Sequence, residues 1–144
     1  MSIKLIQEIY FDESKILNLF NLLSQLTNSP IINKDKLLNI INNLPNNHFI
    51  FVYLNNNKEI IGTITLIIEQ KIIHNGKCVG HIEDLVVDIN YNKQGIATEL
   101  INHCKKIAIN LNCYKIILNC KKELIPFYIK NNFNEQGICM RFDI

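Results

Sequence analysis

The sequence is poor in arginine and has no cluster of basic residues. Arg141 is the only arginine among the 15 lysine and arginine residues, and the formal net charge is +2 at pH 7. The chain has no Lys/Arg-rich run with interleaved aromatic residues, which is the electrostatic footprint of nucleic-acid-binding proteins. We therefore expect no nucleic-acid partner.

The chain also lacks long apolar runs and paired-cysteine motifs. Its longest apolar stretches are interrupted at Glu69, Gln70 and Lys71, far short of a membrane span. The first ten residues have no basic segment followed by an apolar block, so we expect no signal peptide. The five cysteines are an odd number without a CxxC pair, which favours a reducing compartment over a disulfide framework. These features predict a cytoplasmic protein.

The length and the hydrophobic periodicity predict a single domain, residues 1–144, built from strands and helices. The 144 residues are 48% apolar and 19% charged, as in ordinary globular domains. We expect strands at 3–10, 48–54, 59–73, 78–88, 114–120 and 133–142. Helices are expected at 12–26 and from Asn33, with Asp12 and Asn33 as N-caps, at 95–111 with an inward-facing apolar stripe, and at 124–131. The strand at 114–120 is mostly apolar and should be buried on both faces. The order βααβββαβαβ predicts an α/β (α+β) fold with a mixed sheet flanked by helices.

The segment GHIEDLVVDINYNKQGIA, residues 80–97, carries the chemistry of the chain. A predicted strand with Glu83 and Asp84 leads through a loop with Gly95 and Ala97 into a helix. Backbone amides at a helix start have no intrahelical partner, and the helix dipole adds partial positive charge there. Such a junction favours a phosphate or pyrophosphate. The segment therefore indicates an enzyme that holds a phosphorylated cofactor near a pair of acids.

Successive strand residues point to opposite faces, so Glu83 and Asp84 should not reach one ligand atom unless the strand is bulged. Glu83 is the candidate general base, or the group that orders a water acting as the base.

The hairpin before this strand contains Asn75-Gly76, which favours a tight turn with positive φ angles.

Several motifs together resemble a known enzyme family. Asn92-Lys93-Gln94-Gly95-Ile96-Ala97 resembles the Gln/Arg-x-x-Gly-x-Gly/Ala loop of the GCN5-related N-acetyltransferase (GNAT) superfamily. Five further segments are similar to glucosamine 6-phosphate N-acetyltransferases: LSQLT at 23–27, the Glu69-x-Lys71-Ile72-Ile73-His74 stretch, GHIED at 80–84, CYKIIL at 113–118 and FY at 127–128. The resemblance extends from the first helix to the last strand.

The resemblance implies the GNAT fold and direct transfer of acetyl from acetyl-CoA to the amine of glucosamine 6-phosphate, without a metal. It also implies a homodimer formed through the last strand, with the active site near the subunit interface. A backbone N–H near residues 85–87 would polarise the thioester carbonyl. The implied acetyl-CoA contacts are Leu85, Val86, Val87, Lys93, Gln94, Gly95, Ile96, Ala97, Thr98, Asn119 and Tyr128.

The resemblance also assigns roles at the acceptor end. Tyr128 would hydrogen-bond the departing thiolate, and Glu83, Tyr128 and Asn119 form the implied catalytic set. The implied acceptor contacts are Thr27, Lys71, Ile72, Ile73, His74, Glu83, Asp84, Tyr114, Lys115 and Arg141.

Three positions depart from the family pattern. Asn119 replaces the usual Asp, Asn92 replaces Arg or Gln, and Arg141 lies two residues before the position of the family's phosphate-binding Arg, which is Asp143 here. Asn can still donate and accept hydrogen bonds, but it carries no charge. These departures keep open a GNAT enzyme for another small-molecule or protein amine, or a catalytically weak CoA-binding regulatory module.

Two other chemistries are disfavoured by the sequence. An acyl-enzyme on Cys78 or Cys120 is unexpected, because both lie in predicted apolar strands and buried thiols are usually inert. His74, His81 and the cysteines lack the spacing of metal ligands, so we expect no metal site.

Overall fold

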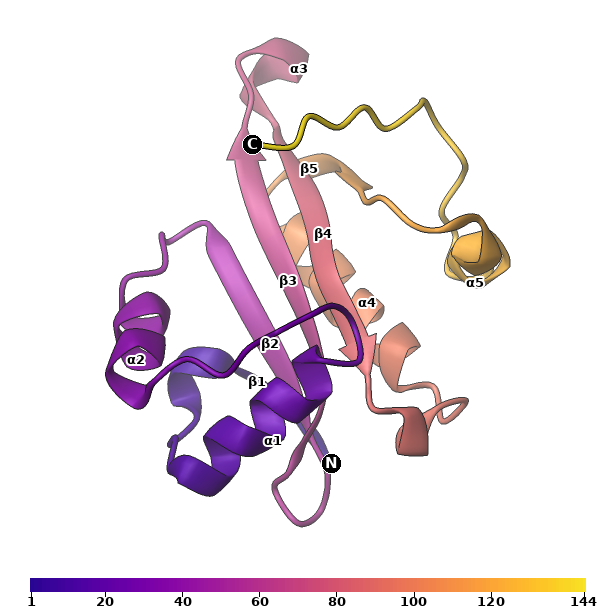
Figure 1. Ribbon diagram of the computed structural model, residues 1–144. Helices are drawn as coiled ribbons and strands as arrows, with labels where there is room; N and C mark the ends of the chain where they lie inside the picture. Colours follow the sequence, from indigo (N-terminus) through magenta and orange to yellow (C-terminus); the bar gives the residue numbers. More distant parts are fainter.

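A mixed five-stranded sheet organises the computed structural model, which describes residues 1–144 (Figure 1). The strands are β1 (Ser2–Leu5), β2 (His48–Leu54), β3 (Ile60–Gln70), β4 (Cys78–Val87) and β5 (Cys113–Ile117), in the spatial order of their numbering. Neighbours from β1 to β4 pair antiparallel, whereas β4 and β5 are parallel. This mixed sheet with flanking helices confirms the predicted fold class.

Helices cover both faces of the sheet. They are α1 (Glu13–Leu23), α2 (Lys34–Asn42), the short turn α3 (Ile73–Gly76), α4 (Ile96–Asn110) and α5 (Ile125–Lys130). Figure 1 shows α1 and α2 in front of the sheet and α4 behind it. The predicted caps form, because Asp12 and Asn33 accept backbone N–H groups three residues on at 2.8 Å and 2.9 Å. None of the helices combines the length and apolarity needed to cross a membrane.

Strand alternation divides the core between the two faces of the sheet. Val52 packs with Phe11 and Leu22 on the α1–α2 side, whereas its neighbour Phe51 packs with Leu100 and Cys104 on the α4 side. The sheet is therefore sandwiched between two apolar layers, as the predicted βααβββαβ part of the chain requires.

Several elements are shorter than their predicted ranges. The first strand ends at Leu5, where a single turn of 3₁₀ helix (Ile6–Glu8) begins, and β3 ends at Gln70. β5 ends at Ile117, and this side chain is 42% exposed, so the expectation of a strand buried on both faces is wrong. The reason is topological: β5 lies at the edge of the sheet and pairs only with β4.

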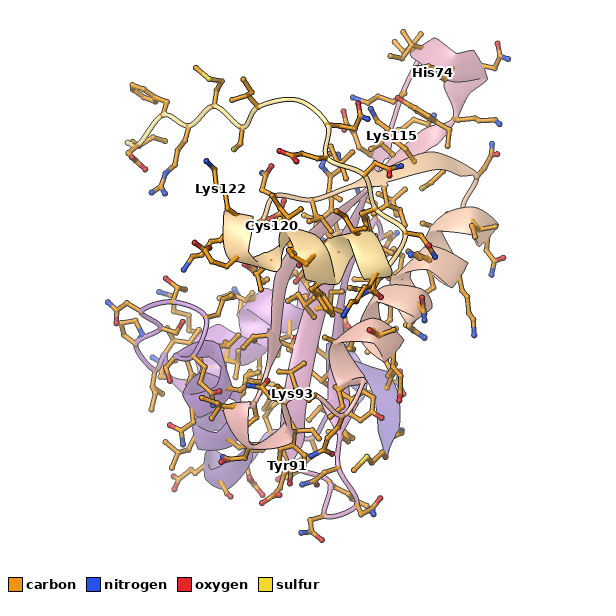
Figure 2. The ribbon with its side chains drawn as sticks, turned by 90° about the vertical axis from the view of Figure 1, so that its right-hand side faces the viewer. His74, Tyr91, Lys93, Lys115, Cys120 and Lys122 are labelled. Atoms are coloured by element: carbon orange, nitrogen blue, oxygen red, sulfur yellow. The ribbon has the colours of Figure 1, made fainter.

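The last predicted strand does not form. Residues 133–142 have no strand pairing, and the chain after α5 is an extended tail without regular secondary structure (Figures 1 and 2). Its alternating apolar side chains are almost fully exposed, and they are Ile138, Met140, Phe142 and Ile144. A strand needs a neighbouring edge to satisfy its backbone, and within this chain the tail lies against none.

The β3–β4 hairpin contains an unusually strained turn. His74 and Asn75 have φ angles of 52° and 57°, and Gly76 follows at 69°. The predicted tight turn is thus present, and the left-handed conformation extends to His74, although few residues other than glycine adopt it. The turn forms the far tip of the long hairpin (Figure 1).

The burial of the cysteines predicts a clear order of reactivity. Burial raises the pKa of Cys104 to about 12, whereas Cys120 and Cys139 are exposed. Since the thiolate is the reactive form, Cys120 and Cys139 should react with a maleimide in the native protein and Cys104 only after unfolding. Mass spectrometry of the labelled peptides at successive times tests this order, and early labelling of Cys104 would contradict the described core.

Candidate active site

A bulge in β4 brings both acids to the surface. Thr63 pairs with Val86 and Thr65 with Glu83, so that Asp84 and Leu85 together oppose a single β3 residue. Asp84 takes a φ angle of 51°, and both carboxylates are exposed. The opposite-face expectation for an unbulged strand therefore does not apply, because the extra residue interrupts the alternation.

β4 and β5 separate just before the bulge. Their pairing ends at His81 with Ile117, and the remainder of β4 has no partner on that side. The backbone of residues 85–87 is thus unpaired on the side that faces β5, and it follows the two carboxylates directly in the sequence. This is the geometry that the expected oxyanion contact requires, and the contact itself stays a prediction.

The loop before α4 has the backbone form of an anion-binding turn. Lys93 and Gly95 have φ angles of 63° and 83°, and a Cβ at Gly95 would meet open space. The first helical hydrogen bond runs from the N–H of Glu99 to Gly95 O, at 3.0 Å. The amides just before Glu99 precede this bond and have no helical acceptor. Buried Ile96 anchors this helix start to the core.

Tyr128 and Asn119 line a cavity of about 660 Å³ between β5, α5 and the tail. Tyr128 is buried, and burial, followed by the nearby Cys120, raises the pKa of its hydroxyl. The phenol therefore stays protonated at neutral pH and is available as a hydrogen-bond donor. Cys120 lines the same cavity and is exposed, because β5 ends before it; the expectation that this thiol is buried in a strand is wrong.

Aromatic and cationic groups gather at the hairpin end of β5. The ring of His74 lies 4.1 Å from that of Tyr114, and Lys115 Nζ lies 5.4 Å from the centre of the Tyr114 ring. The strained hairpin turn thereby places His74 beside β5. Three of the predicted acceptor contacts, His74, Tyr114 and Lys115, therefore lie together. A lysine beside an aromatic face is a favourable contact.

A polar network on β3 and β4 was not predicted from the sequence. The Glu69 carboxylate hydrogen-bonds to Lys71 Nζ and, at 2.7 Å, to His81 Nε2. These hydrogen bonds, first from Lys71 and then from His81, hold the pKa of Glu69 below its ordinary value. The position of the hairpin turn is the signal that could have predicted this contact. Counting back along both strands from the turn places Glu69 and His81 diagonally on neighbouring strands.

Other predicted residues lie apart from these groups. Thr27 is exposed after the end of α1. Arg141 lies on the exposed tail, where its Nε donates to Asp143 at 2.6 Å. Ile72 and Ile73 are exposed at the hairpin tip. Within this chain, the structure therefore does not bring Arg141 or Thr27 to the acids.

The groups are ordered along β4. Figure 2 shows His74 and Lys115 at one end of the molecule, Lys93 and Tyr91 at the other, and Cys120 between them. The acids occupy the middle of β4. Glu83 lies four residues before Val87, the last residue of the strand, which corresponds to about 13 Å along the strand. No cluster of three or more His, Cys, Asp or Glu side chains with metal-binding geometry is present.

The family model described as "Acetyltransferase (GNAT) family" matches residues 16–133, which include both the bulged strand and the loop. The chain belongs to the GNAT acetyltransferase family. The match also covers α5 with Tyr128 and most of the cavity lining, whereas residues 1–15 and the tail after Phe133 lie outside it.

Curated proteins with similar sequences include named enzymes. A "Glucosamine 6-phosphate N-acetyltransferase" from Trypanosoma brucei brucei is 39% identical over 85 residues, covering 59% of this chain and 58% of the relative. The chain spans about half the length of the first curated relatives it matches, 58%, 52% and 49% in three of them.

Solved structures match over nearly the whole chain. A crystal structure of a Trypanosoma brucei acetyltransferase has a TM-score of 0.87 and 30% identity, with 99% of both chains covered. The crystal structure of glucosamine-6-phosphate N-acetyltransferase from Arabidopsis thaliana has a TM-score of 0.83 and 26% identity, again with 99% of both chains covered. The fold of this GNAT chain is thus found in experimental structures.

The left-handed conformation at Asp84 predicts a position-specific stability loss. Asp84→Val should destabilise the fold by about 1–2 kcal/mol, because a β-branched residue is strained at positive φ. Glu83→Val, on the regular part of the same exposed strand, should change stability by less than about 0.5 kcal/mol. Urea unfolding followed by far-UV circular dichroism tests this, and equal midpoints for the two variants would contradict the bulge.

Proposed function

We propose that this protein transfers acetyl from acetyl-CoA to the amine of glucosamine 6-phosphate, giving N-acetylglucosamine 6-phosphate and CoA. The observation that carries the proposal is the arrangement along β4. Two exposed carboxylates, one in the β4 bulge and one directly before it, lie between a helix start with the backbone form of an anion-binding turn and an aromatic, lysine-bearing cluster. One substrate with a pyrophosphate and a second with a phosphate and an amine fit this order. The names of the relatives support the same acceptor.

The donor would lie between the loop and the acids. Backbone amides at the start of α4 would bind the pyrophosphate, with Lys93 adding positive charge. The thioester arm would lie beside the unpaired backbone of residues 85–87, where a backbone N–H polarises the acetyl carbonyl. The side chains of Val86 and Ile96 are buried in the core, so their contribution comes through the backbone. The contacts proposed for this half are Leu85, Val86, Val87, Lys93, Gln94, Gly95, Ile96, Ala97 and Thr98.

The transfer itself requires one proton acceptor and one proton donor. The amine nitrogen bonds to the acetyl carbon while the C–S bond of the thioester breaks, and the amine loses a proton. Glu83 takes this proton or orders the water that does. Tyr128, held protonated by burial, donates a hydrogen bond to the leaving thiolate, and the uncharged Asn119 borders the same cavity.

The acceptor would bind on the side of the acids that is nearer the β3–β4 hairpin turn. Lys71, Lys115 and His74 can supply hydrogen bonds to a sugar phosphate, and the Tyr114 ring holds His74 and Lys115 in place. The remaining proposed contacts are Thr27, Ile72, Ile73, Asp84 and Arg141. Because Arg141 lies on the free tail, its contribution requires the tail to dock.

We also propose a homodimer in which the tail of one chain pairs with the free edge of β5 in its partner. The side chains of Ile138, Met140 and Phe142 alternate along one side of the tail and are 88–89% exposed. Large apolar side chains exposed in a row mark an interaction surface, and an unpaired strand edge offers backbone hydrogen bonds. Such an exchange would bring Arg141 and the acceptor site to the subunit interface. The five free cysteines fit a reducing cytoplasmic compartment for this dimer.

A thiol-release assay tests the proposed reaction. Purified protein with acetyl-CoA should release free CoA thiol when glucosamine 6-phosphate is added, because only this acceptor offers both the phosphate and the amine. Glucosamine alone should be a poor acceptor. Release with glucosamine or polyamines but not with the phosphate ester would point to another amine, and acetyl-CoA binding without turnover would favour a regulatory module.

Tyr128→Phe sharpens the same assay. It removes the proposed hydrogen bond to the thiolate and should lower kcat by roughly 10²-fold. Tyr10→Phe is the matched control, since the Tyr10 side chain is exposed and does not line the cavity, so this variant should leave kcat unchanged.

The dimer has its own prediction. The wild-type chain should sediment at twice its monomer mass, and the double substitution Met140→Lys/Phe142→Lys should give a monomer, because charges replace the apolar side of the tail. Ile31→Lys/Ile40→Lys adds the same charge at exposed positions outside the tail and should remain dimeric. Analytical ultracentrifugation distinguishes these outcomes. A monomeric wild-type chain, or a dimeric tail variant, would reject the exchange.

A further inference from the structure

Glu69 and His81 form a carboxylate–imidazole pair that the reaction described above does not use. One Glu69 oxygen bonds Lys71 Nζ, and the other lies 2.7 Å from His81 Nε2. All three side chains are partly exposed, with 30%, 42% and 29% of the Lys71, Glu69 and His81 side chains accessible. The pair is thus open to solvent and substrate, and each carboxylate oxygen has its own partner.

The carboxylate fixes the tautomer of the imidazole. An ionised carboxylate only accepts hydrogen bonds, so Nε2 of His81 must carry the hydrogen. In the neutral ring, Nδ1 is then left with a lone pair. The ring that results is a proton acceptor with a fixed orientation, backed by a negative charge that stabilises the imidazolium. This is the relation between the carboxylate and the histidine in hydrolase triads.

His81 lies two residues before Glu83, the proposed base. The β3–β4 register is regular from Gly80 to Glu83, so His81 and Glu83 share one face of the sheet. Residues two apart on a strand are separated by roughly 7 Å, a distance that one water molecule spans. The bulge follows Glu83 and does not disturb this relation.

Few other charged groups face the ring. On β4 the neighbour on the same face is Glu83, and β3 with its end supplies Glu69 and Lys71. Across the sheet at the same level, His48 on β2 pairs with Ile67, which pairs with His81. On β5 the nearest lysine is Lys115, which pairs with Val79. Glu69 and Glu83 thus flank His81, and Lys71 is already paired with Glu69.

We propose that His81 accepts the proton of the acceptor amine through a water molecule held by Glu83, and that Glu69 is the positioning residue that orients the His81 ring. The proton passes from the amine nitrogen to the water and from the water to Nδ1, and the imidazolium later releases it to solvent. An imidazole is ordinarily a stronger base than a carboxylate, which favours transfer to the ring over transfer to Glu83 alone. This inference rests on the proposed acetyl transfer.

The test uses the thiol-release assay with acetyl-CoA and glucosamine 6-phosphate. His81→Ala should lower kcat by roughly 10²-fold, with the KM of either substrate little changed. Imidazole added to the assay should restore part of this loss, because it supplies the missing proton acceptor. Glu69→Gln should also lower kcat, but without rescue, since the ring is present and only its tautomer is released. His48→Ala, another histidine on the same face, should keep wild-type kcat.

The outcomes separate the two proposals. No turnover by the wild-type protein overturns the proposed function and this inference with it. Turnover by the wild type together with full kcat in His81→Ala overturns the inference alone. If His81→Ala does not fold by circular dichroism, His81→Gln takes its place. A folded variant that loses kcat and regains none of it in imidazole also overturns the inference.

Discussion

The parting of β4 from β5 is the constraint on which the candidate site depends. The parallel pairing of these strands stops at His81 and Ile117, and the next residues of β4 enter a bulge with Asp84 in the left-handed conformation. A bulge bends its strand and increases the local twist, so the two strands cannot resume their pairing. The unpaired backbone that results would be costly if it were buried without a partner. Here it lies on the side of β4 where we place the acyl donor.

The same break explains why the acids are usable. In a regular strand, one of two adjacent side chains would point into the core below α1 or α4. The inserted residue at Asp84 allows Glu83 and Asp84 both to remain at the surface while Ile82 and Val86 stay buried. Strain at one backbone position is thus held in place by apolar packing on either side of it. Such strain persists only where the surrounding structure over-determines it.

Local patterns predicted the parts of the fold that depend on local physics. The caps Asp12 and Asn33, and the apolar stripe of α4, were predicted from spacing alone and are present. The exposure of β5 differs from the prediction because the apolar residues 116–118 indicate burial but not which strands lie beside them. The sequence does not predict the bulge, because it depends on how β4 registers with β3. No residue of β4 alone encodes that register.

The site residues divide in the same way, into those that local sequence patterns indicate and those that only the folded sheet brings together. The sequence indicated the loop, the acids and the Tyr114–Lys115 pair, and the structure places His74 against Tyr114. The Glu69–His81 contact was missed because each residue lies within an otherwise apolar strand and gains meaning only when the hairpin is folded. The hairpin turn that brings His74 to Tyr114 also sets this contact. A single strained turn therefore organises both the acceptor cluster and the neighbouring imidazole.

The tail borders the side of the candidate site that carries Tyr128. It lines the same cavity as Tyr128 and Asn119, so the surface that we propose for subunit exchange and the leaving-group side of the reaction share one space. In an isolated chain, water would reach this cavity and the thiolate contact that we propose there. A partner strand on that edge would satisfy the backbone of β5, bury the alternating apolar side chains and exclude water together. Acetyl transfer in this fold should therefore depend on the tail even though no tail residue takes part in the proposed proton transfers.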